Sequence, residues 1–199
     1  GPRLLIGTGG TVTAEELIRA ADPILHRLVE ESGETALIVR RIGMSAVCLH
    51  EVPSLHPLRV TIAPATALPL RSGALGTVLL AYAPDEVLEE VLGEEPAGIP
   101  AERDADRLRE RLAAILAGGS ARSTGEVSPG AVAVAAPILA PDGIVGAIGV
   151  IGPEARCGSA WQARVERLVL ALARSMASSL GTGRSSQESH HSEGSTSTD

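Results

Sequence analysis

The sequence has 199 residues, 44% of them hydrophobic, and carries a formal net charge of −7. This length and apolar content suit one domain with a core of ordinary size. The acidic charge argues against binding of nucleic acid by this chain alone, because phosphate contacts need a basic surface. Trp161 and Tyr82 are its only aromatic residues, which disfavours a base-stacking platform for single strands.

Neither a membrane span nor a secretory leader is predicted. The sequence has no run of about 18 apolar residues and no basic segment followed by an apolar one at its start. We therefore expect a cytoplasmic protein without a membrane partner. Cys48 and Cys157 are isolated and form neither a disulfide framework nor a metal cluster, so no metal and no cofactor is expected.

The N-terminal part is predicted to be a linker followed by a helix. Residues 1–10 combine a short apolar piece with glycines, which is typical of a linker end. Thr13 and Glu16 have the spacing of a capping box. An apolar stripe then continues to Gly33, which predicts the helix end, and Pro23 is expected to restart or kink the helix.

Strands and helices are then expected to alternate. Two or three strands are predicted at 35–41, 45–52 and 58–63, and a glycine turn at 73–76 leads into an apolar helix that ends before Pro84. A short helix begins there, and residues 103–116 form an amphipathic helix. Its inward positions are expected to be Leu108, Leu112, Ile115 and Leu116. A polar strand at 121–126 follows.

Residues 130–153 are predicted to form a β-hairpin around Pro141–Asp142–Gly143. A three-residue loop with Gly143 at positive φ determines the register. In that register the cross-strand pairs are Ala140–Ile144, Ala135–Gly149 and Ala133–Ile151.

Alternation along the two strands sorts their side chains into two faces. One face is ordinary core and carries Val132, Val134, Ala136, Ile138, Ile144, Ile148 and Val150. The other, the small-residue face, carries Ala131, Ala133, Ala135, Pro137, Ala147, Gly149 and Ile151. Either a helix packs closely on that face or a ligand cavity lies there. Composition alone favours close packing.

The C-terminal part begins with a helix that Ser159 is expected to cap, with Val165, Leu168, Leu172 and Met176 at helical spacing. From Gly181 onward the chain is serine-rich and lacks apolar residues, which predicts a disordered tail over 181–199. A pair of histidines in this tail, His190 and His191, suggests a metal site only weakly, and a solvated tail is favoured.

No catalytic residues are predicted. The chain lacks a nucleophile elbow, a P-loop and the common metal motifs. Backbone N–H groups at the glycine turn 73–76 could meet a small anion, because a helix begins there. Cys48 would need a nearby base to act as a nucleophile, and a small buried side chain is the favoured interpretation.

Four segments resemble the effector-binding domain of IclR-type transcriptional regulators, which has a GAF-like fold. They are ESGETALIVRR (31–41), HPLRVT (56–61), LPLRSGALGTVLLA (68–81) and GEVSPGAVAVAAPILAPDGIVGAIGVIGP (125–153). The resemblance implies an α+β fold with a central antiparallel sheet flanked by helices. It also implies a homo-dimer or tetramer that binds DNA only through an N-terminal winged helix-turn-helix domain absent from this chain.

On this resemblance we divide the chain into three parts. Residues 1–21 are assigned to a linker and linker helix that follow the DNA-binding domain, and residues 22–180 to the effector-binding domain. The GPRLL segment at 1–5 is similar to the segment that, in this family, connects the winged helix-turn-helix domain to the linker helix. Residues 181–199 remain the disordered tail.

The resemblance also implies which residues line an effector pocket. They are Pro57 and Val60 on the third strand, Ala74 and Leu75 at the turn, Ser123, Ala131 and Ala133, and Gly149 and Ile151 on the last strand. The last four lie on the small-residue face deduced from the hairpin register. That agreement favours a ligand cavity over close helix packing on the small-residue face.

This chain departs from relatives that hold small carboxylates. Such members tend to have serines at the positions of Gly149 and Ile151, a polar or acidic group at Ser123, and in some cases a thiol at Ala133. A frequent family lysine is replaced by Thr77. A buried carboxylate without donors is unfavourable, which disfavours a pyruvate-like effector.

A larger apolar effector is therefore expected, such as an aromatic or fatty acid. Ser123, the turn amides or Arg71 would meet its polar end. A degenerate pocket stays open as an alternative.

Three classes of function follow. The leading one is ligand sensing that controls a DNA-binding domain, and the protein is then not an enzyme. The others are a ligand-free oligomerisation module and a GAF-like redox enzyme. The last would require an accessible, activated Cys48 or Cys157.

Overall fold

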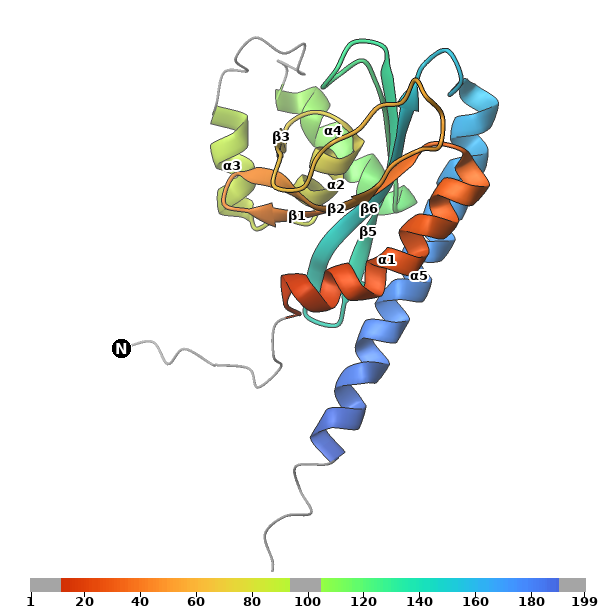
Figure 1. The fold of residues 1–199 in the computed structure, drawn as a ribbon. Coiled ribbons are helices and arrows are strands. Elements are labelled where there is room, and N and C mark those ends of the chain that lie inside the picture. Colours follow the sequence, from red (N-terminus) through yellow and green to blue (C-terminus); the bar gives the residue numbers. More distant parts are fainter. Residues whose placement is uncertain (1–11, 94–104, 190–199) are drawn as a thin grey trace, which may run out of the picture.

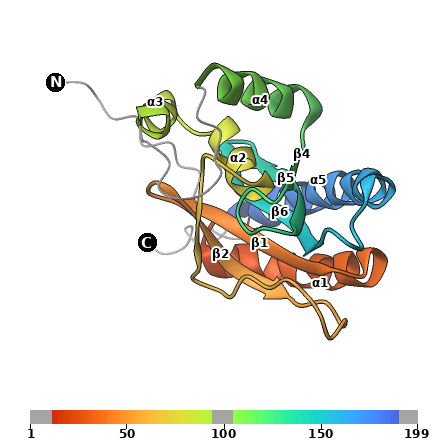
Figure 2. The same ribbon diagram turned by 90° about the horizontal axis from the view of Figure 1, so that it is seen from above.

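A six-stranded antiparallel sheet separates two helical layers (Figures 1 and 2). The computed structural model describes residues 12–93 and 105–189. Its elements are α1 (Ala14–Ser32), β1 (Thr35–Ile42), β2 (Ser45–Val52), β3 (Ala67–Pro69), α2 (Ala74–Ala81), α3 (Asp85–Gly93), α4 (Ala105–Gly118), β4 (Ala121–Thr124), β5 (Ala131–Ala140), β6 (Gly143–Pro153) and α5 (Ser159–Ser189). The strand order is β3-β2-β1-β6-β5-β4. Helices α1 and α5 cover one face, and α2, α3 and α4 lie over the other (Figure 2). The predicted α+β class with flanking helices is confirmed.

Helix α1 has the predicted caps at both ends. The Glu16 N–H donates to Thr13 Oγ1 at 3.2 Å, and the Thr13 N–H donates to Glu16 Oε2 at 2.8 Å. Gly33 closes the helix with a φ of 80°, which is unstrained only for glycine. The helix is continuous through Pro23. It also continues across residues 21 and 22, where the linker part was expected to meet the effector-binding part. That division of the chain stays a prediction.

The third strand is not where the sequence pattern placed it. Residues 58–63 form no strand, and β3 is Ala67–Pro69, with Ser45 opposite Pro69. Prolines at 53 and 57 have no N–H to donate to a ladder. The Ile62 N–H donates instead to Glu51 Oε2, and backbone pairing with β2 resumes only at residues 65 and 66.

The hairpin register is confirmed over most of its length and shifts near the turn. Ala135 lies opposite Gly149 and Ala133 opposite Ile151. The register shifts between Ile138 and Leu139, so the expected Ala140–Ile144 pair is wrong and Ala140 pairs with Gly143 instead. A β-bulge of this kind reverses the alternation of side chains. As a result Ile144 packs on the α2 side of the sheet and not with the core on the α1 side. Gly143 has the expected positive φ, 121°.

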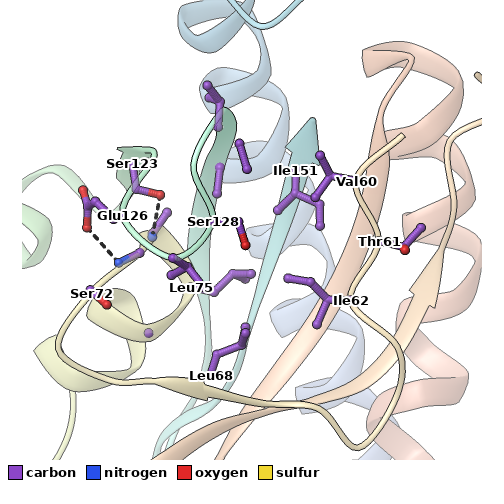
Figure 3. A pocket seen from close by; sticks show the side chains of 17 residues that line it. Val60, Thr61, Ile62, Leu68, Ser72, Leu75, Ser123, Glu126, Ser128 and Ile151 are labelled. Atoms are coloured by element: carbon purple, nitrogen blue, oxygen red, sulfur yellow. Dashed lines mark hydrogen bonds between the residues drawn. The ribbon is translucent and has the colours of Figure 1, made fainter. Parts of the chain in front are cut away.

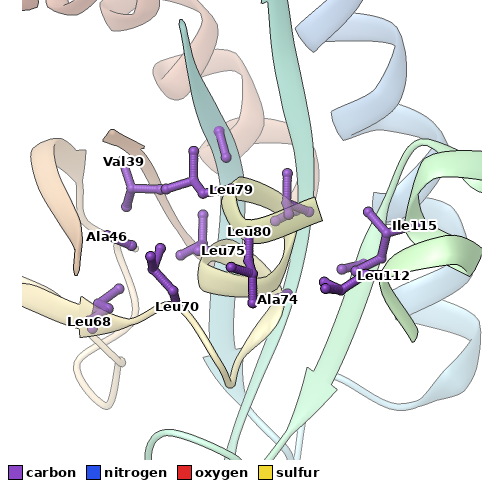
Figure 4. Close-up of a cluster of buried hydrophobic side chains, with 14 of the residues drawn as sticks. Val39, Ala46, Leu68, Leu70, Ala74, Leu75, Leu79, Leu80, Leu112 and Ile115 are labelled. Atoms are coloured by element: carbon purple, nitrogen blue, oxygen red, sulfur yellow. The ribbon is translucent and has the colours of Figure 1, made fainter. Parts of the chain in front are cut away.

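Each face of the sheet carries its own hydrophobic core. The core under α1 and α5 includes Leu25, Leu28, Val134, Ile148, Val165 and Met176. The core under α2 and α4 includes Val39, Leu75, Leu79, Leu112 and Ile115 (Figure 4). Leu116 is 51% exposed, contrary to the inward position predicted for it. Helix α4 buries only the narrow stripe of Leu108, Leu112 and Ile115 at the outer edge of its layer, so the next position faces water.

Helix α5 runs past the expected start of the tail. It extends to Ser189, so residues 181–189 are helical, and 190–199, with both tail histidines, lie outside the described residues. Once a helix has formed, each further residue adds one backbone hydrogen bond. The helix can therefore continue for a few turns into a segment whose composition disfavours it. Within 12–93 and 105–189, no helix combines the length and hydropathy needed to span a membrane.

Candidate functional site

A cavity lies between the start of α2, the loop joining β4 to β5, and the segment that follows β2 (Figure 3). The cavity has a volume of about 70 Å³. That is several times the roughly 10–15 Å³ that one water requires. The lining residues are Val60, Thr61, Ile62, Leu68, Ser72, Gly73, Ala74, Leu75, Gly76, Ser123, Glu126, Val127, Ser128, Ala131, Val132, Ala133 and Ile151.

Most of the residues expected around the pocket lie there. Val60, Ala74, Leu75, Ser123, Ala131, Ala133 and Ile151 all line the cavity. They come from the segment after β2, from α2 and from strands β4, β5 and β6, so the fold brings together positions that lie far apart in the sequence. Pro57 and Gly149 are not among the lining residues. Their role as effector-binding residues stays a prediction without support from the cavity.

Gly149 lies beneath a packed side chain. A Cβ placed there would be 2.8 Å from the Val134 carbonyl oxygen and 2.9 Å from Leu75 Cδ2. Helix α2 therefore covers this part of the small-residue face, and the expectation of empty space in front of Gly149 is wrong. The cavity opens further along the same face, beside Ala131, Ala133 and Ile151. Close packing and a cavity thus share one face of the hairpin.

Arg71 has a different place from the one expected. It is 8% exposed, and its Nη1 donates to the Val91 carbonyl oxygen of α3 at 2.9 Å. It is not a lining residue of the cavity. Arg71 therefore holds α3 against the turn before α2 and does not offer its charge to a ligand in the cavity.

Internal groups already occupy two N–H groups at the start of α2. The Gly73 N–H donates to Glu126 Oε2 at 2.8 Å, and the Ala74 N–H donates to Ser123 Oγ at 3.0 Å (dashed lines in Figure 3). Arg111 of α4 donates to the same Glu126 oxygen at 2.8 Å. The partial positive charge of a helix start favours such a carboxylate. The turn amides thus have partners within the chain.

The cavity wall holds one buried polar group without a partner. Ser72 is 2% exposed, and its hydroxyl oxygen has no hydrogen-bond partner in the described part of the chain. A buried hydroxyl in that state is unfavourable by about 1–3 kcal/mol. Ser72 immediately precedes the glycine turn and lines the cavity, so a ligand that fills the cavity would lie next to it.

The segment after β2 forms the opposite wall and is held at both ends. Arg156 Nη2 donates to the Leu58 carbonyl oxygen at 2.8 Å, and Arg156 Nε donates to Glu34 Oε1 at 2.6 Å. Further along, the Ile62 N–H donates to Glu51 Oε2 at 2.8 Å. These contacts keep Val60, Thr61 and Ile62 over the sheet without a strand ladder.

The sequence pattern missed several wall residues, with Ser72, Glu126 and Ser128 the most informative. Glu126 and Ser128 belong to the GEVSPG segment at 125–130, whose two glycines indicate a loop that turns back. That spacing could have flagged the loop as part of the site. It could not have shown that Glu126 reaches Gly73, because 53 residues separate the two in the sequence.

Neither cysteine is suited to thiolate chemistry. Both are buried, and burial raises the pKa of the Cys48 thiol to about 11 and that of Cys157 to about 12. A nucleophilic cysteine needs a lowered pKa and access to solvent. Neither lines the cavity. In the described ranges no three His, Cys, Asp or Glu residues are grouped so that they could hold a metal ion.

Residues 9–178 match the sequence model of a protein family described as bacterial transcriptional regulator IclR, C-terminal. The chain is also 32% identical over 165 residues to the HTH-type transcriptional regulator BhcR of Paracoccus denitrificans. That alignment covers 80% of this chain and 59% of the relative. The chain therefore spans about three-fifths of the length of that regulator.

Solved structures show the same fold. An IclR-type transcriptional regulator from Silicibacter superposes with a TM-score of 0.79 at 24% identity, covering 84% of this chain and 68% of that one. An IclR homologue from Microbacterium hydrocarbonoxydans, complexed with 4-hydroxybenzoate, superposes with a TM-score of 0.74 at 22% identity. That superposition covers 84% of this chain and 70% of the other.

Proposed function

This chain belongs to the IclR family of bacterial transcriptional regulators, to whose C-terminal domain it corresponds, and we propose that it binds a small effector in the cavity beside α2. Effector occupancy would control DNA binding by a separate winged helix-turn-helix domain. The chain spans only part of its relatives' length, so the activity of the whole regulator belongs to the proposal. A regulator that acts on a bacterial chromosome works in the cytoplasm.

The observation that carries this proposal is the composition of the cavity. Most of its wall is aliphatic, and the polar side chains on it are few, which is the usual make-up of a small-molecule site. Such a wall suits a small organic molecule with a mainly apolar or aromatic body. The Microbacterium homologue in complex with 4-hydroxybenzoate supports an aromatic compound as one candidate class.

A route from ligand to DNA-binding domain is available through the sheet. The cavity joins residues 60–62, the start of α2, the β4–β5 loop and the end of β6. Strand β6 pairs with β1, and α1 packs on the opposite face of these strands. Filling the cavity would fix these four segments relative to one another, and we propose that α1 carries the change toward the N-terminal side.

A thermal-shift screen tests the proposal. Small aromatic and aliphatic acids, amides and alcohols are added to the protein, and a ligand at about 100 times its dissociation constant should stabilise it by roughly 2.7 kcal/mol. The variant Ala133→Leu places a larger side chain in the cavity and should lose the shift. Ala114→Leu, on the exposed side of α4, makes the same change away from the cavity and should keep it.

Two results would contradict the proposal. If Ala133→Leu still responds to the best ligand as strongly as Ala114→Leu does, the ligand binds elsewhere. If no compound stabilises the wild-type protein, a ligand-free oligomerisation module is the better description. Operator binding by a protein that joins this chain to its DNA-binding domain, measured with and without the ligand, then tests the regulatory step.

A further inference from the structure

We propose that Glu126 is a built-in anion at the start of α2, and that it makes the cavity select uncharged effectors over carboxylates. This inference rests on the proposed effector site and specifies the chemical class of its ligand. Glu126 then determines which ligands the cavity accepts, a role that the sequence pattern did not suggest.

The anion-binding position at the start of α2 is already occupied by a carboxylate of the chain itself. The buried N–H of Gly73 donates to Glu126 Oε2 at 2.8 Å, and Arg111 donates to the same oxygen at 2.8 Å. The neighbouring Ala74 N–H donates to Ser123 Oγ. A ligand carboxylate would have to displace Glu126 or lie beside a like charge, which is unfavourable.

The loop that carries Glu126 is packed tightly on the turn before α2. A Cβ at Gly73 would lie only 2.7 Å from Val127 Cγ2, and Gly73 has a φ of 76°. Only glycine allows both this conformation and this close approach. The side chains of Glu126 and Arg111 are 25% and 21% exposed, so the pair is largely shielded from water. Displacing Glu126 would therefore disturb a packed contact and an ion pair.

No cationic side chain of the described residues lines the cavity. Among the described residues that line it, Glu126 is the only ionisable side chain. The other polar side chains are the hydroxyls of Thr61, Ser72, Ser123 and Ser128. Burial of an unpaired carboxylate is strongly unfavourable, whereas a neutral polar group needs only one hydrogen-bond partner.

Ser72 provides the independent indication of a ligand. Its buried hydroxyl oxygen has no partner in the described chain, and it is a wall residue next to Gly73. Ser123 accepts the Ala74 N–H, and its own hydroxyl hydrogen remains able to donate. A neutral carbonyl, amide or hydroxyl on the effector would satisfy such groups without placing a second negative charge near Glu126.

The test uses pairs of probes that differ in charge and little in shape. Benzamide is compared with benzoate and hexanamide with hexanoate, at neutral pH, by calorimetry and thermal shift. Wild-type protein should bind the amide at least about tenfold more tightly than the acid, a difference of about 1.4 kcal/mol. Glu126→Ala should reduce or reverse that preference by at least about tenfold.

Two further variants make the test specific. Glu110→Ala removes the same charge from an exposed position on α4 and should leave the preference unchanged. Glu126→Gln removes the charge but retains an oxygen for the Gly73 N–H, so it should also weaken the preference, even if the alanine variant folds poorly.

Three outcomes would overturn the inference. If wild-type protein binds acid and amide equally, Glu126 does not select between them, and the proposed function still stands. If wild-type protein discriminates and the Glu126 variants discriminate as strongly, the selection comes from elsewhere in the site. If neither amides nor acids bind the wild type or the variants, the proposed effector site fails, and this inference fails with it.

Discussion

Two buried serines beside the start of α2 differ in what their hydroxyls do. Ser123 accepts the Ala74 N–H at 3.0 Å, whereas Ser72 has no partner in the described chain. Ser123→Ala would leave a buried N–H unsatisfied and should lower the free energy of unfolding by about 1–3 kcal/mol. Ser72→Ala removes an unsatisfied group and should leave stability unchanged or raise it. Urea denaturation of both variants checks this, and equal losses would contradict the assigned hydrogen bonds.

At Gly149, the lack of a side chain allows α2 to pack closely on the sheet. A leucine there would meet the Val134 carbonyl oxygen and Leu75 of α2. We expect Gly149→Leu to destabilise the protein by about 1–3 kcal/mol or more through overpacking, whether or not a ligand is present. Gly158→Ala is the control, because nothing lies within 4 Å of its Cβ position. A Gly149→Leu protein that melts with the wild type would show that α2 does not cover this position.

At the scale of elements, one carboxylate joins α5 to β4. Glu166 accepts a hydrogen bond from Ser120 Oγ at 2.7 Å and pairs with Arg122. These contacts, the Arg122 hydrogen bond foremost, lower the pKa of Glu166 below its ordinary value. A lowered folded-state pKa means that the folded protein releases the proton more readily than the unfolded chain. The stabilisation is therefore present above the ordinary glutamate pKa and is lost as the pH falls through the lowered one.

The pH dependence gives a direct test of this link. Glu166→Gln should melt at a lower temperature than the wild type at pH 7. This difference in melting temperature should become smaller as the pH falls below about 4.3, the ordinary glutamate pKa. Glu154→Gln, at an exposed position before α5, should show little difference at either pH. A gap for Glu166→Gln that stays constant with pH would mean that its charge does not link α5 to β4.

At the scale of the whole molecule, we expect the chain to self-associate as a homo-dimer or tetramer. The reason is its family, since oligomeric regulators pair with symmetric operators. Light scattering at micromolar concentration should give a mass of at least two chains. A monomer mass across the micromolar range would contradict the prediction for this chain.

We also expect that this chain alone does not bind duplex DNA specifically. Its net charge of −7 opposes the counterion release that drives binding to DNA. A gel-shift titration with duplex DNA at physiological salt should show no sequence-dependent complex. A sequence-dependent shift at nanomolar protein concentration would contradict the prediction, because this chain would then need a DNA-binding surface of its own.

The site could be predicted in part because its strands carry a local pattern. Alternation and the turn residues placed Ala133 opposite Ile151 and assigned both to one face, and both line the cavity. The exact course of the hairpin near Ile144 could not be read in the same way, because a bulge leaves no regular signal in the sequence. The strand predicted at 58–63 failed for a related reason, since Pro53 and Pro57 separate it from the ladder.

What the sequence determined by itself is local. The caps of α1 at Thr13 and Gly33, the existence of α2 and the register around Ala135 follow from backbone preferences and side-chain periodicity over a few residues. Only the tertiary structure decided that Leu75 covers Gly149 while Ala133 faces a cavity, that Arg71 bonds to α3, and that Glu126 bonds to Gly73. These outcomes depend on the distances between segments far apart in the chain, which the packing of the whole domain sets.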